Sequence, residues 1–182
     1  MDFFTELETV RERWNVLQHP FYQRWSAGEL TQAELAVYAG QYRHAVVALA
    51  DASRATAAVA GDELRDELSG HAAEETAHID LWDAFTAAVG GDVTAAPTAE
   101  TVACASAWAG NGERSLLPSL AAMYAIESGQ PAISQTKTEG LVSHYGFTPG
   151  SDATRYFELH AVRDVEHAEY ERALLEIGRA HV

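Results

Sequence analysis

One stretch near the carboxyl end, YFELHAVRDVEHAEYERALL (residues 156–175), places three metal-ligand side chains on a single helical face. His160, Asp164 and His167 follow one another at the i, i+4, i+7 spacing of an α-helix. The face continues into Phe157 on one side and Glu171 and Leu174 on the other, so the trio is expected to face the interior. Buried imidazoles and carboxylates are costly unless they pair or bind a cation. The pattern therefore predicts a helix that carries either a cation site or core histidines tied to an aspartate.

Length and charge limit the function classes. The 182 residues are expected to form one domain, residues 1–182. The net charge is −15 and no run of Lys or Arg offers a phosphate-binding stripe, which argues against nucleic acid and anionic membranes as partners. The amino terminus carries acids where a signal peptide needs basic residues, so we expect a cytoplasmic protein.

Cysteine usage restricts the kind of metal. Cys104 is the only cysteine, so neither an internal disulfide nor a multi-cysteine zinc site can form. It lies among alanines, where a small buried residue is the simplest interpretation. Any metal must be bound by nitrogen and oxygen, which suits iron, manganese or zinc.

Apolar periodicity predicts an all-α chain without strands. A T-x-x-E capping box, Thr31 to Glu34, predicts the start of a long helix that ends at Gly61, and Pro131 is expected to kink or restart a helix. Further helices are expected over residues 2–18, 62–89, 100–109, 117–127 and 156–175. Turns or loops are expected at residues 19–30, 90–99, 111–112 and 148–150.

The helix expected over residues 62–89 carries a second informative face. Its apolar seam is interrupted only at the centre, by His71, Glu75 and His78. Glu75 and His78 form an E-x-x-H pair, whose two side chains lie one turn apart and can bind one ion. Glu74 is one step off the seam and is expected to be solvated. The pair alone is a weak signal, because E-x-x-H is common by chance in helices rich in Ala and Glu.

Glu127 adds a third inward carboxylate at the end of its own seam. Three helices then offer three carboxylates and three imidazoles, and two ferrous ions would balance their charge better than one. Such ligands suit iron that reacts with O2. A ferritin-like bundle is one comparison, but the long helix after Thr31 has Gln41 and His44 and no inward Glu. His44 lies off the apolar seam. It is expected to be a surface histidine, a histidine with its hydrogen bonds satisfied, or a residue that lines a pocket.

Four passages resemble the heme-oxygenase-like di-iron oxidases and oxygenases. They are HPFYQRWSAGEL, HIDLW, AIESGQPAISQTKTEGLVSHYGF and YFELHAVRDVEHAEYERALL. Their order matches as well as their content, over nearly the whole chain. The chain is similar to TenA and PqqC relatives, and most of all to the CADD-type proteins.

The resemblance implies a compact seven-helix bundle that binds two irons and activates O2. His78, Glu127, His160, Asp164 and His167 match ligand positions. The sixth ligand is a departure, because the CADD-type pattern has Glu where this chain has His71. UndA-like members have E-x-x-H, which favours Glu75 over Glu74 and His71.

The activity that the resemblance implies is the oxidation of a small molecule, an amino acid or a fatty acid, in specialised metabolism. The irons would form a peroxo-diferric species that abstracts hydrogen, oxygenates nitrogen or cleaves a C–C bond. Arg43 and Lys137 are candidate anchors for a substrate carboxylate. A homodimer is expected from analogy.

Two alternatives remain. Tyr22 and Lys137 match positions that the CADD-type pattern uses when the protein itself is the source of p-aminobenzoate. Structural roles are favoured over this one, because Ile126 replaces a further tyrosine that the pattern expects. Tyr22 would then be a packing residue, and Lys137 would lie at the surface or behind the ligands. Tyr42, Tyr124 and Tyr156 are expected to line the core or pocket. The second alternative is a metal-free TenA-like thiamin-type hydrolase or binding protein, for which Cys104 is the sole candidate nucleophile.

Overall fold

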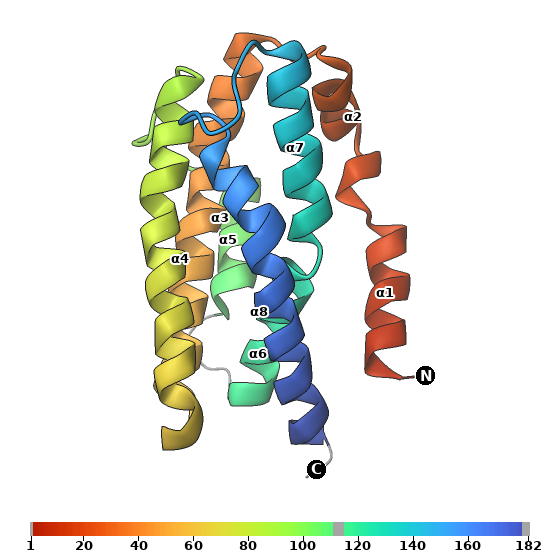
Figure 1. The fold of residues 1–182 in the computed structure, drawn as a ribbon, viewed down its shortest axis with the longest axis vertical. Coiled ribbons are helices and arrows are strands. Elements are labelled where there is room, and N and C mark those ends of the chain that lie inside the picture. Colours follow the sequence, from red (N-terminus) through yellow and green to blue (C-terminus); the bar gives the residue numbers. More distant parts are fainter. Residues whose placement is uncertain (1, 111–114, 180–182) are drawn as a thin grey trace.

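The computed structural model describes residues 2–110 and 115–179, and within them every regular element is helical (Figure 1). The all-α prediction is confirmed. The elements in chain order are α1 (Phe3–Arg13), the 3-10 helix η1 (Val16–Gln18), α2 (Pro20–Ala27), α3 (Gln32–Val59), α4 (Asp62–Ala88), α5 (Ala99–Ala109), α6 (Leu116–Glu127), α7 (Gln130–His144) and α8 (Arg155–Arg179). The expected seven-helix bundle corresponds to α2 to α8, and α1 lies along its outside (Figure 1). None of the described helices is long and apolar enough to cross a membrane.

The long helices α3 and α4 begin where the sequence predicts. The capping box is present: Thr31 Oγ1 accepts from Glu34 N at 3.2 Å, and Glu34 Oε2 accepts from Thr31 N at 2.8 Å. Helix α3 ends at Val59, and Gly61, expected to end it, is the N-cap residue of α4. The two helices lie antiparallel along most of the bundle (Figure 1).

The amino-terminal region differs from the prediction. The helix expected over residues 2–18 ends at Arg13 and is followed by η1, and the segment expected to be turn-rich contains helix α2. Pro20 starts this helix because an N1 proline needs no hydrogen-bond partner for its nitrogen. His19 Nδ1 accepts from Phe21 N at 3.2 Å, and Gly28 ends α2 with a φ of 72°.

The remaining boundaries agree closely with the prediction. Helix α5 begins at Ala99, one residue before the expected start, and Pro131 lies in the first turn of α7. The turn expected at Asn111-Gly112 lies outside the described residues.

Two apolar clusters fill the bundle, one toward each end. The first contains Trp25, Trp82 and Phe157, and the second contains Leu68 and Leu175. Along α4 and α8 the buried polar residues lie between these clusters. Each helix therefore packs through apolar side chains on both sides of its buried polar segment. This arrangement holds the polar side chains inside the bundle although each is costly to bury.

Helix α2 is held against α7 by a close backbone approach. Trp25 Nε1 donates to the Lys137 carbonyl at 3.1 Å. Gly140 makes room for the indole, since a Cβ there would lie 2.5 Å from Trp25 Cδ1. This contact fixes Tyr22 of α2 beside Lys137 of α7, whose Nζ lies 5.4 Å from the Tyr22 ring centroid.

Candidate metal centre

The structure brings the three predicted polar faces together in the middle of the bundle. Each member is less than a tenth exposed. Helix α4 provides His71, Glu75 and His78, α6 provides Glu127, and α8 provides His160, Asp164, His167 and Glu171. The centre thus contains four carboxylates and four imidazoles.

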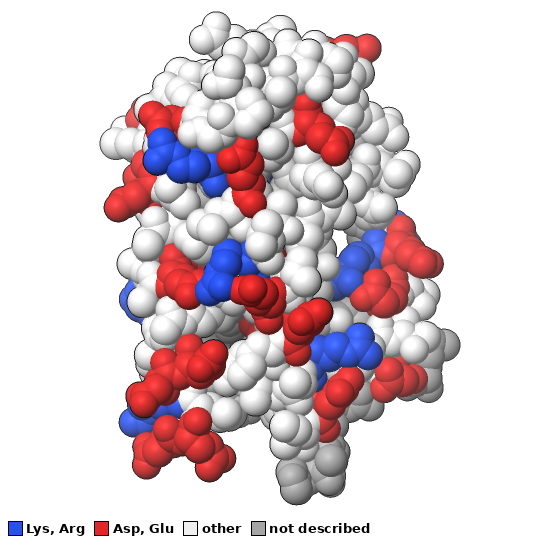
Figure 2. Space-filling model, viewed as in Figure 1, with Lys and Arg blue, Asp and Glu red and all other residues white. Residues whose placement is uncertain are grey.

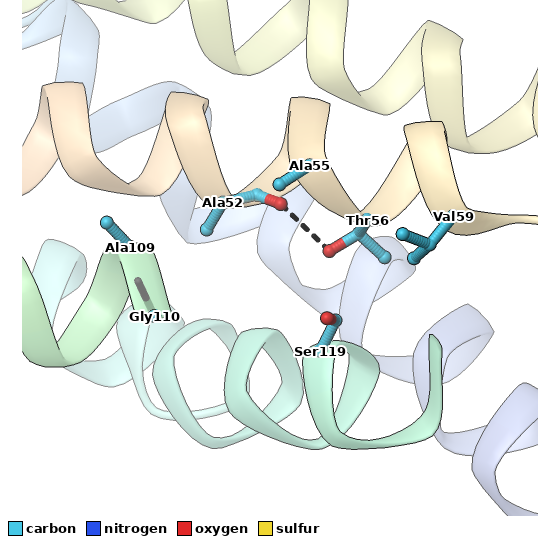
Figure 3. Close-up of a pocket in the computed structure, with 7 residues that line it drawn as sticks. All are labelled: Ala52, Ala55, Thr56, Val59, Ala109, Gly110 and Ser119. Atoms are coloured by element: carbon cyan, nitrogen blue, oxygen red, sulfur yellow. Dashed lines mark hydrogen bonds between the residues drawn. The ribbon is translucent and has the colours of Figure 1, made fainter. Parts of the chain in front are cut away.

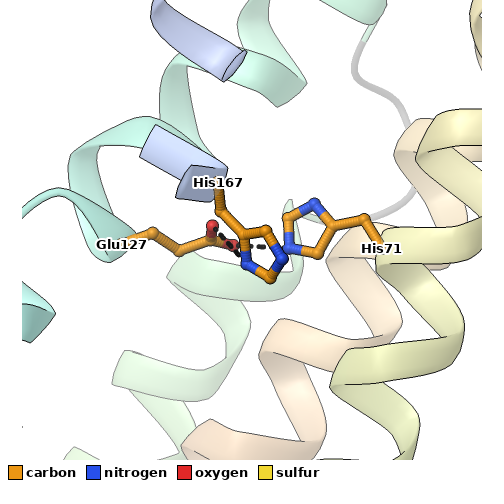
Figure 4. A group of neighbouring side chains, drawn as sticks. All are labelled: His71, Glu127 and His167. Carbon is orange, nitrogen blue, oxygen red and sulfur yellow. Dashed lines mark ion pairs between the residues drawn. The ribbon is translucent and has the colours of Figure 1, made fainter. Parts of the chain in front are cut away.

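One group of candidate ligands joins α4, α6 and α8 (Figure 4). His71 Nε2 lies 3.3 Å from Glu127 Oε1, and His167 Nδ1 lies 3.6 Å from Glu127 Oε2. The two imidazole rings are 3.8 Å apart between centroids. One potential ligand atom from each residue falls within 4.8 Å of the other two, which is a spacing that one metal ion could bridge.

A second group lies next to it along the bundle. Glu75 Oε1 is 3.0 Å from His78 Nδ1, and the His78 and His160 rings are 4.5 Å apart. These three residues also offer ligand atoms within 4.8 Å of one another, and Glu75 forms a further group with Asp164 and His167. Because Glu75 and His167 each take part in two groups, the three groups adjoin one another along the bundle.

Two imidazoles are oriented by contacts behind them. His160 Nδ1 lies 2.7 Å from the Tyr156 carbonyl, which can only accept, so Nδ1 carries the proton and Nε2 presents its lone pair to the centre. His167 Nε2 contacts Glu74 Oε2 at 3.3 Å, which leaves Nδ1 directed at Glu127. Such outer contacts are typical of histidines that bind metal.

The inward polar atoms form no well-directed hydrogen bonds, although some of them lie at ion-pair distance from one another. They are His71 Nε2, Glu75 Oε1, His78 Nδ1, both oxygens of Glu127, Asp164 and Glu171, His160 Nε2 and His167 Nδ1. Buried carboxylate and imidazole atoms are rarely left unpaired, and cations supply the missing partners. All four carboxylates together carry −4 when ionised, which two divalent ions would balance.

Burial and mutual repulsion disfavour ionisation of this cluster. Burial, with the charges of Glu127 and Glu75, raises the pKa of Asp164 to about 9. Burial also raises the pKa of Glu127 and Glu171 well above the ordinary value. The pKa of His160 falls to about 4 because of burial, and that of His167 falls likewise to about 4. Bound cations would favour the ionised carboxylates and neutral imidazoles, so metal binding would displace protons.

Glu75 behaves differently from the other carboxylates. Burial alone would raise its pKa, but His78, His160 and His71 outweigh this effect and lower it. Glu75 is therefore the acid of the cluster most readily ionised before any cation arrives.

Glu171 was not predicted to belong to the centre. It is fully buried one turn after His167, and both its oxygens are unpartnered. Its place on the seam of α8 was visible in the sequence, since it stands where an apolar residue is expected. His71 was the less favoured candidate for the sixth ligand. It lies in the centre together with Glu75.

Three predicted side chains lie outside the ligand groups, and one of them, His44, is a satisfied histidine, which was one of its expected roles. Arg43 is a poor substrate anchor because its guanidinium is paired with Asp83, at 2.6 and 3.0 Å. His44 Nε2 bonds the Ala95 carbonyl at 2.9 Å and so holds the loop before α5. Glu74 is not simply solvated, because it accepts two 2.7 Å bonds from Arg163 Nη2 and contacts His167.

Lys137 is not a surface residue. It is fully buried, and its Nζ faces five aromatic rings at 4.7 to 6.0 Å from their centroids. The rings belong to Tyr22, Tyr38, Tyr42, Trp82 and Phe157, which we call the aromatic cage. Burial lowers the pKa of the Lys137 amine to about 7 and raises that of the Tyr22 phenol. A neutral amine beside a protonated phenol is thus accessible near neutral pH.

The other predicted aromatic residues lie in or beside the core, with Tyr124 and Tyr156 buried and Tyr42 partly buried. Tyr156 stacks on His160 with centroids 3.9 Å apart, and Tyr42 lies 4.9 Å from Trp82. Tyr124 belongs to the second apolar cluster, 5.4 Å from Phe4. These positions agree with the prediction.

Cys104 is exposed, contrary to the expectation of a buried residue, because its side of α5 faces outward. Burial of its sulfur, although partial, raises the pKa of the thiol, which is the opposite of what a nucleophile requires. A small cavity lies near the far end of α5, where Thr56 and Ser119 face each other across it (Figure 3). Its volume of about 20 Å³ suits a water molecule and no organic substrate.

Comparisons with known proteins agree with this centre. Residues 30–177 match the sequence model of a family described as iron-containing redox enzymes. Proteins named 4-aminobenzoate synthase are similar over most of their length: that of Chlamydia muridarum is 34% identical over 97% of this chain and 79% of its own, and that of Nitrosomonas europaea is 30% identical over 96% and 78%.

Solved structures show the same fold. A TenA homologue from P. horikoshii OT3 has a TM-score of 0.75 at 16% identity, covering 94% of this chain and 83% of its own. A domain with a heme oxygenase-like fold from Shewanella denitrificans OS217 has a TM-score of 0.76 at 20% identity, covering 97% and 79%. The heme-oxygenase-like resemblance is therefore confirmed, and the chain belongs to the family of iron-containing redox enzymes.

Proposed function

We propose that this protein makes 4-aminobenzoate in an O2-dependent reaction at a centre of two irons, with its own Tyr22 as the source of the aromatic ring. Support comes from the relatives of that name and from the placement of Tyr22 beside the buried amine of Lys137. The placement of these two side chains is the observation that carries the proposal. The expected external amino acid or fatty acid receives no comparable support.

The donor set divides naturally between two ions. His71, Glu127 and His167 would hold one, and Glu75, His78 and His160 the other. Asp164, which forms a group with Glu75 and His167, would add a carboxylate to the pair of ions, and the two oxygens of Glu171 make no hydrogen bond either. Bound iron would supply the reduction of O2 and oxidising power for nearby groups. The protein would surround both ions with buried side chains that exclude water and hold the ligands in place.

Tyr22 already contains most of the product. Conversion of a tyrosine side chain to 4-aminobenzoate requires three changes: nitrogen replaces the phenol oxygen, the Cα–Cβ bond breaks, and Cβ is oxidised to a carboxylate. O2 is the oxidant, and Lys137 Nζ, 5.4 Å from the centroid of this ring, is the amine. Transfer of this nitrogen would break the Lys137 Cε–Nζ bond, with Cε oxidised to an aldehyde at the expense of O2 and the phenol oxygen released as water, while Cα stays in the main chain. Its lowered pKa, due to burial, keeps part of the amine unprotonated and nucleophilic at neutral pH.

Aromatic side chains connect the metal centre to Tyr22 without a gap. Tyr156 stacks on His160, its ring lies 4.8 Å from that of Trp82, and Trp82 lies 4.9 Å from Tyr42. Tyr42 and Tyr38 are 5.4 Å apart between centroids. Tyr38 in turn lies beside Tyr22, whose pKa it helps to set. These contacts give oxidising equivalents a route from the centre to the aromatic cage.

An external carboxylate substrate fits less well because both candidate anchors are engaged. Arg43 is paired with Asp83, and Lys137 is enclosed by the aromatic cage. The metal-free hydrolase alternative lacks an activated nucleophile, since the pKa of Cys104 is raised.

The test begins with anaerobic loading of ferrous iron, followed by O2 and a chemical reductant. We expect two irons per chain, 4-aminobenzoate detectable by mass spectrometry, and a loss of mass at Tyr22 in the recovered protein. Tyr22→Phe should bind iron normally and make no product, whereas the matched variant Tyr124→Phe should make it. Glu127→Ala should lose iron and retain its helical content.

Product formation by Tyr22→Phe, or an unmodified Tyr22 after turnover, would overturn the internal source. Full activity of Glu127→Ala would overturn the metal centre itself.

A further inference from the structure

A cleft between α4 and α8 reaches the metal centre from the surface. Its volume is about 300 Å³. The residues that line it belong to the stretches 66–74 of α4 and 163–170 of α8. Two of these, His71 and His167, belong to the same candidate ligand group, so the cleft joins solvent to one of the two cation positions.

The outer part of the cleft is acidic. Asp66, Glu67 and Glu166 are exposed, and Arg163 is the one Lys or Arg among the lining residues. Figure 2 shows acidic groups gathered over the lower part of α4 and beside α8. Carboxylates concentrated at the mouth of a cleft raise the local concentration of cations and their association rate.

The inner end of the cleft holds an unpartnered ligand atom. His71 is 6% exposed, and its Nε2 lies 3.3 Å from Glu127 Oε1 without forming a hydrogen bond. The acidic mouth thus leads to a buried imidazole nitrogen that makes no hydrogen bond and faces the Glu127 carboxylate, which distinguishes this cleft from an ordinary acidic surface.

An ion pair spans the cleft between its mouth and its inner end. Arg163 of α8 donates through Nη2 to both oxygens of Glu74 on α4, at 2.7 Å each, and its Nη1 bonds Glu166. Glu74 Oε2 is also 3.3 Å from His167 Nε2. The Arg163 charge opposes an incoming cation and occupies the carboxylate nearest to the ligands.

We propose that this cleft is the route by which divalent cations reach the centre, with Asp66, Glu67 and Glu166 collecting the ion and the Arg163–Glu74 pair acting as the gate. The inference rests on the metal centre of the proposed function and adds how that centre is filled. The chemical class of the ligand is a hydrated divalent cation.

Charge provides the first test. Stopped-flow absorbance of the metal-free chain mixed with Co²⁺ measures the rate of metal uptake without any O2 chemistry. Asp66→Asn, Glu67→Gln and Glu166→Gln combined should slow uptake about tenfold at low salt with the final Co²⁺ per chain unchanged. The control combines Glu12→Gln, Asp80→Asn and Glu139→Gln, three exposed acids outside the cleft lining, and should leave the rate near that of the wild type. Arg163→Gln should accelerate uptake.

Obstruction provides the second test. A Cβ at Gly70 would meet nothing within 4 Å, so a larger side chain can enter the cleft without a clash. Gly70→Leu should slow uptake, and Gly70→Ala, which adds one methyl group, should not. Equal rates for all variants at full loading would overturn the route and leave the metal centre intact. Failure of the wild-type chain to bind Co²⁺ would overturn the centre, and the route with it.

Discussion

Replacing Lys137 by methionine should stabilise the metal-free protein while abolishing product formation. The side chain is fully buried, and burial lowers the pKa of its amine to about 7, from an ordinary value of 10.5. Methionine has nearly the same volume and no charge, so it should fill the space within the aromatic cage without a cavity.

The magnitude follows from proton linkage. Because the pKa is lower in the folded state, the folded chain binds fewer protons than the unfolded chain between about pH 7 and 10.5. Stability therefore rises with pH across this window, and the cost of the buried ammonium is fully present below it. The shift corresponds to a cost of about 4 kcal/mol at pH 7 and about 2 kcal/mol at pH 9.

This cost comes from burial alone, and the aromatic cage partly offsets it. Five rings lie within 6.0 Å of Nζ, and desolvated cation–π contacts stabilise an ammonium by about 2 kcal/mol or more. We therefore expect Lys137→Met to raise the free energy of unfolding by about 2 to 4 kcal/mol at pH 7 and by less at pH 9.

Urea unfolding of the metal-free wild type and variant, followed by circular dichroism at the two pH values, measures the difference directly. Thr138→Val, on the neighbouring position of α7, controls for changes unrelated to the amine. A variant less stable than the wild type at pH 7, or a difference that does not shrink toward pH 9, would refute the reasoning.

Three further predictions concern the fold. Gly140→Ala should destabilise the protein by about 1 to 3 kcal/mol in thermal unfolding, because the added methyl group would overlap Trp25; unchanged stability would show that α2 can move away. Thr31→Ala removes the capping box and should cost about 1 kcal/mol in urea unfolding, and Thr31→Ser should recover most of it. Arg43→Gln breaks the pair with Asp83 and should cost less than about 1 kcal/mol without changing product yield; a large loss of product would restore Arg43 as a substrate anchor.

The sequence was most informative where one local pattern decides the structure. Periodicity predicted the long helices, and the Thr31–Glu34 box predicted the start of α3, because both depend on residues within one or two turns. The predicted ligands of α4 and α8 also follow from spacing, since a helix places residues three and four apart on one face.

The sequence was misleading where one local pattern is compatible with two different structures. Residues 19–30, which contain Pro20, were expected to form a turn, although a proline can also start a helix, as Pro20 does for α2. Glu74 and Glu75 are adjacent, and only the packing of α8 against α4 shows that the first orients His167 while the second enters the centre.

The burial of Lys137 is a property that only the tertiary structure reveals. A lysine on a helix with a mixed pattern is normally exposed, and nothing near it in the sequence indicates that rings from α2, α3, α4 and α8 enclose it. The sequence by itself determined the helices and the residues that each could turn inward, because these depend on local spacing. Which inward residues meet, and with what pKa, depends on contacts between helices far apart in the chain.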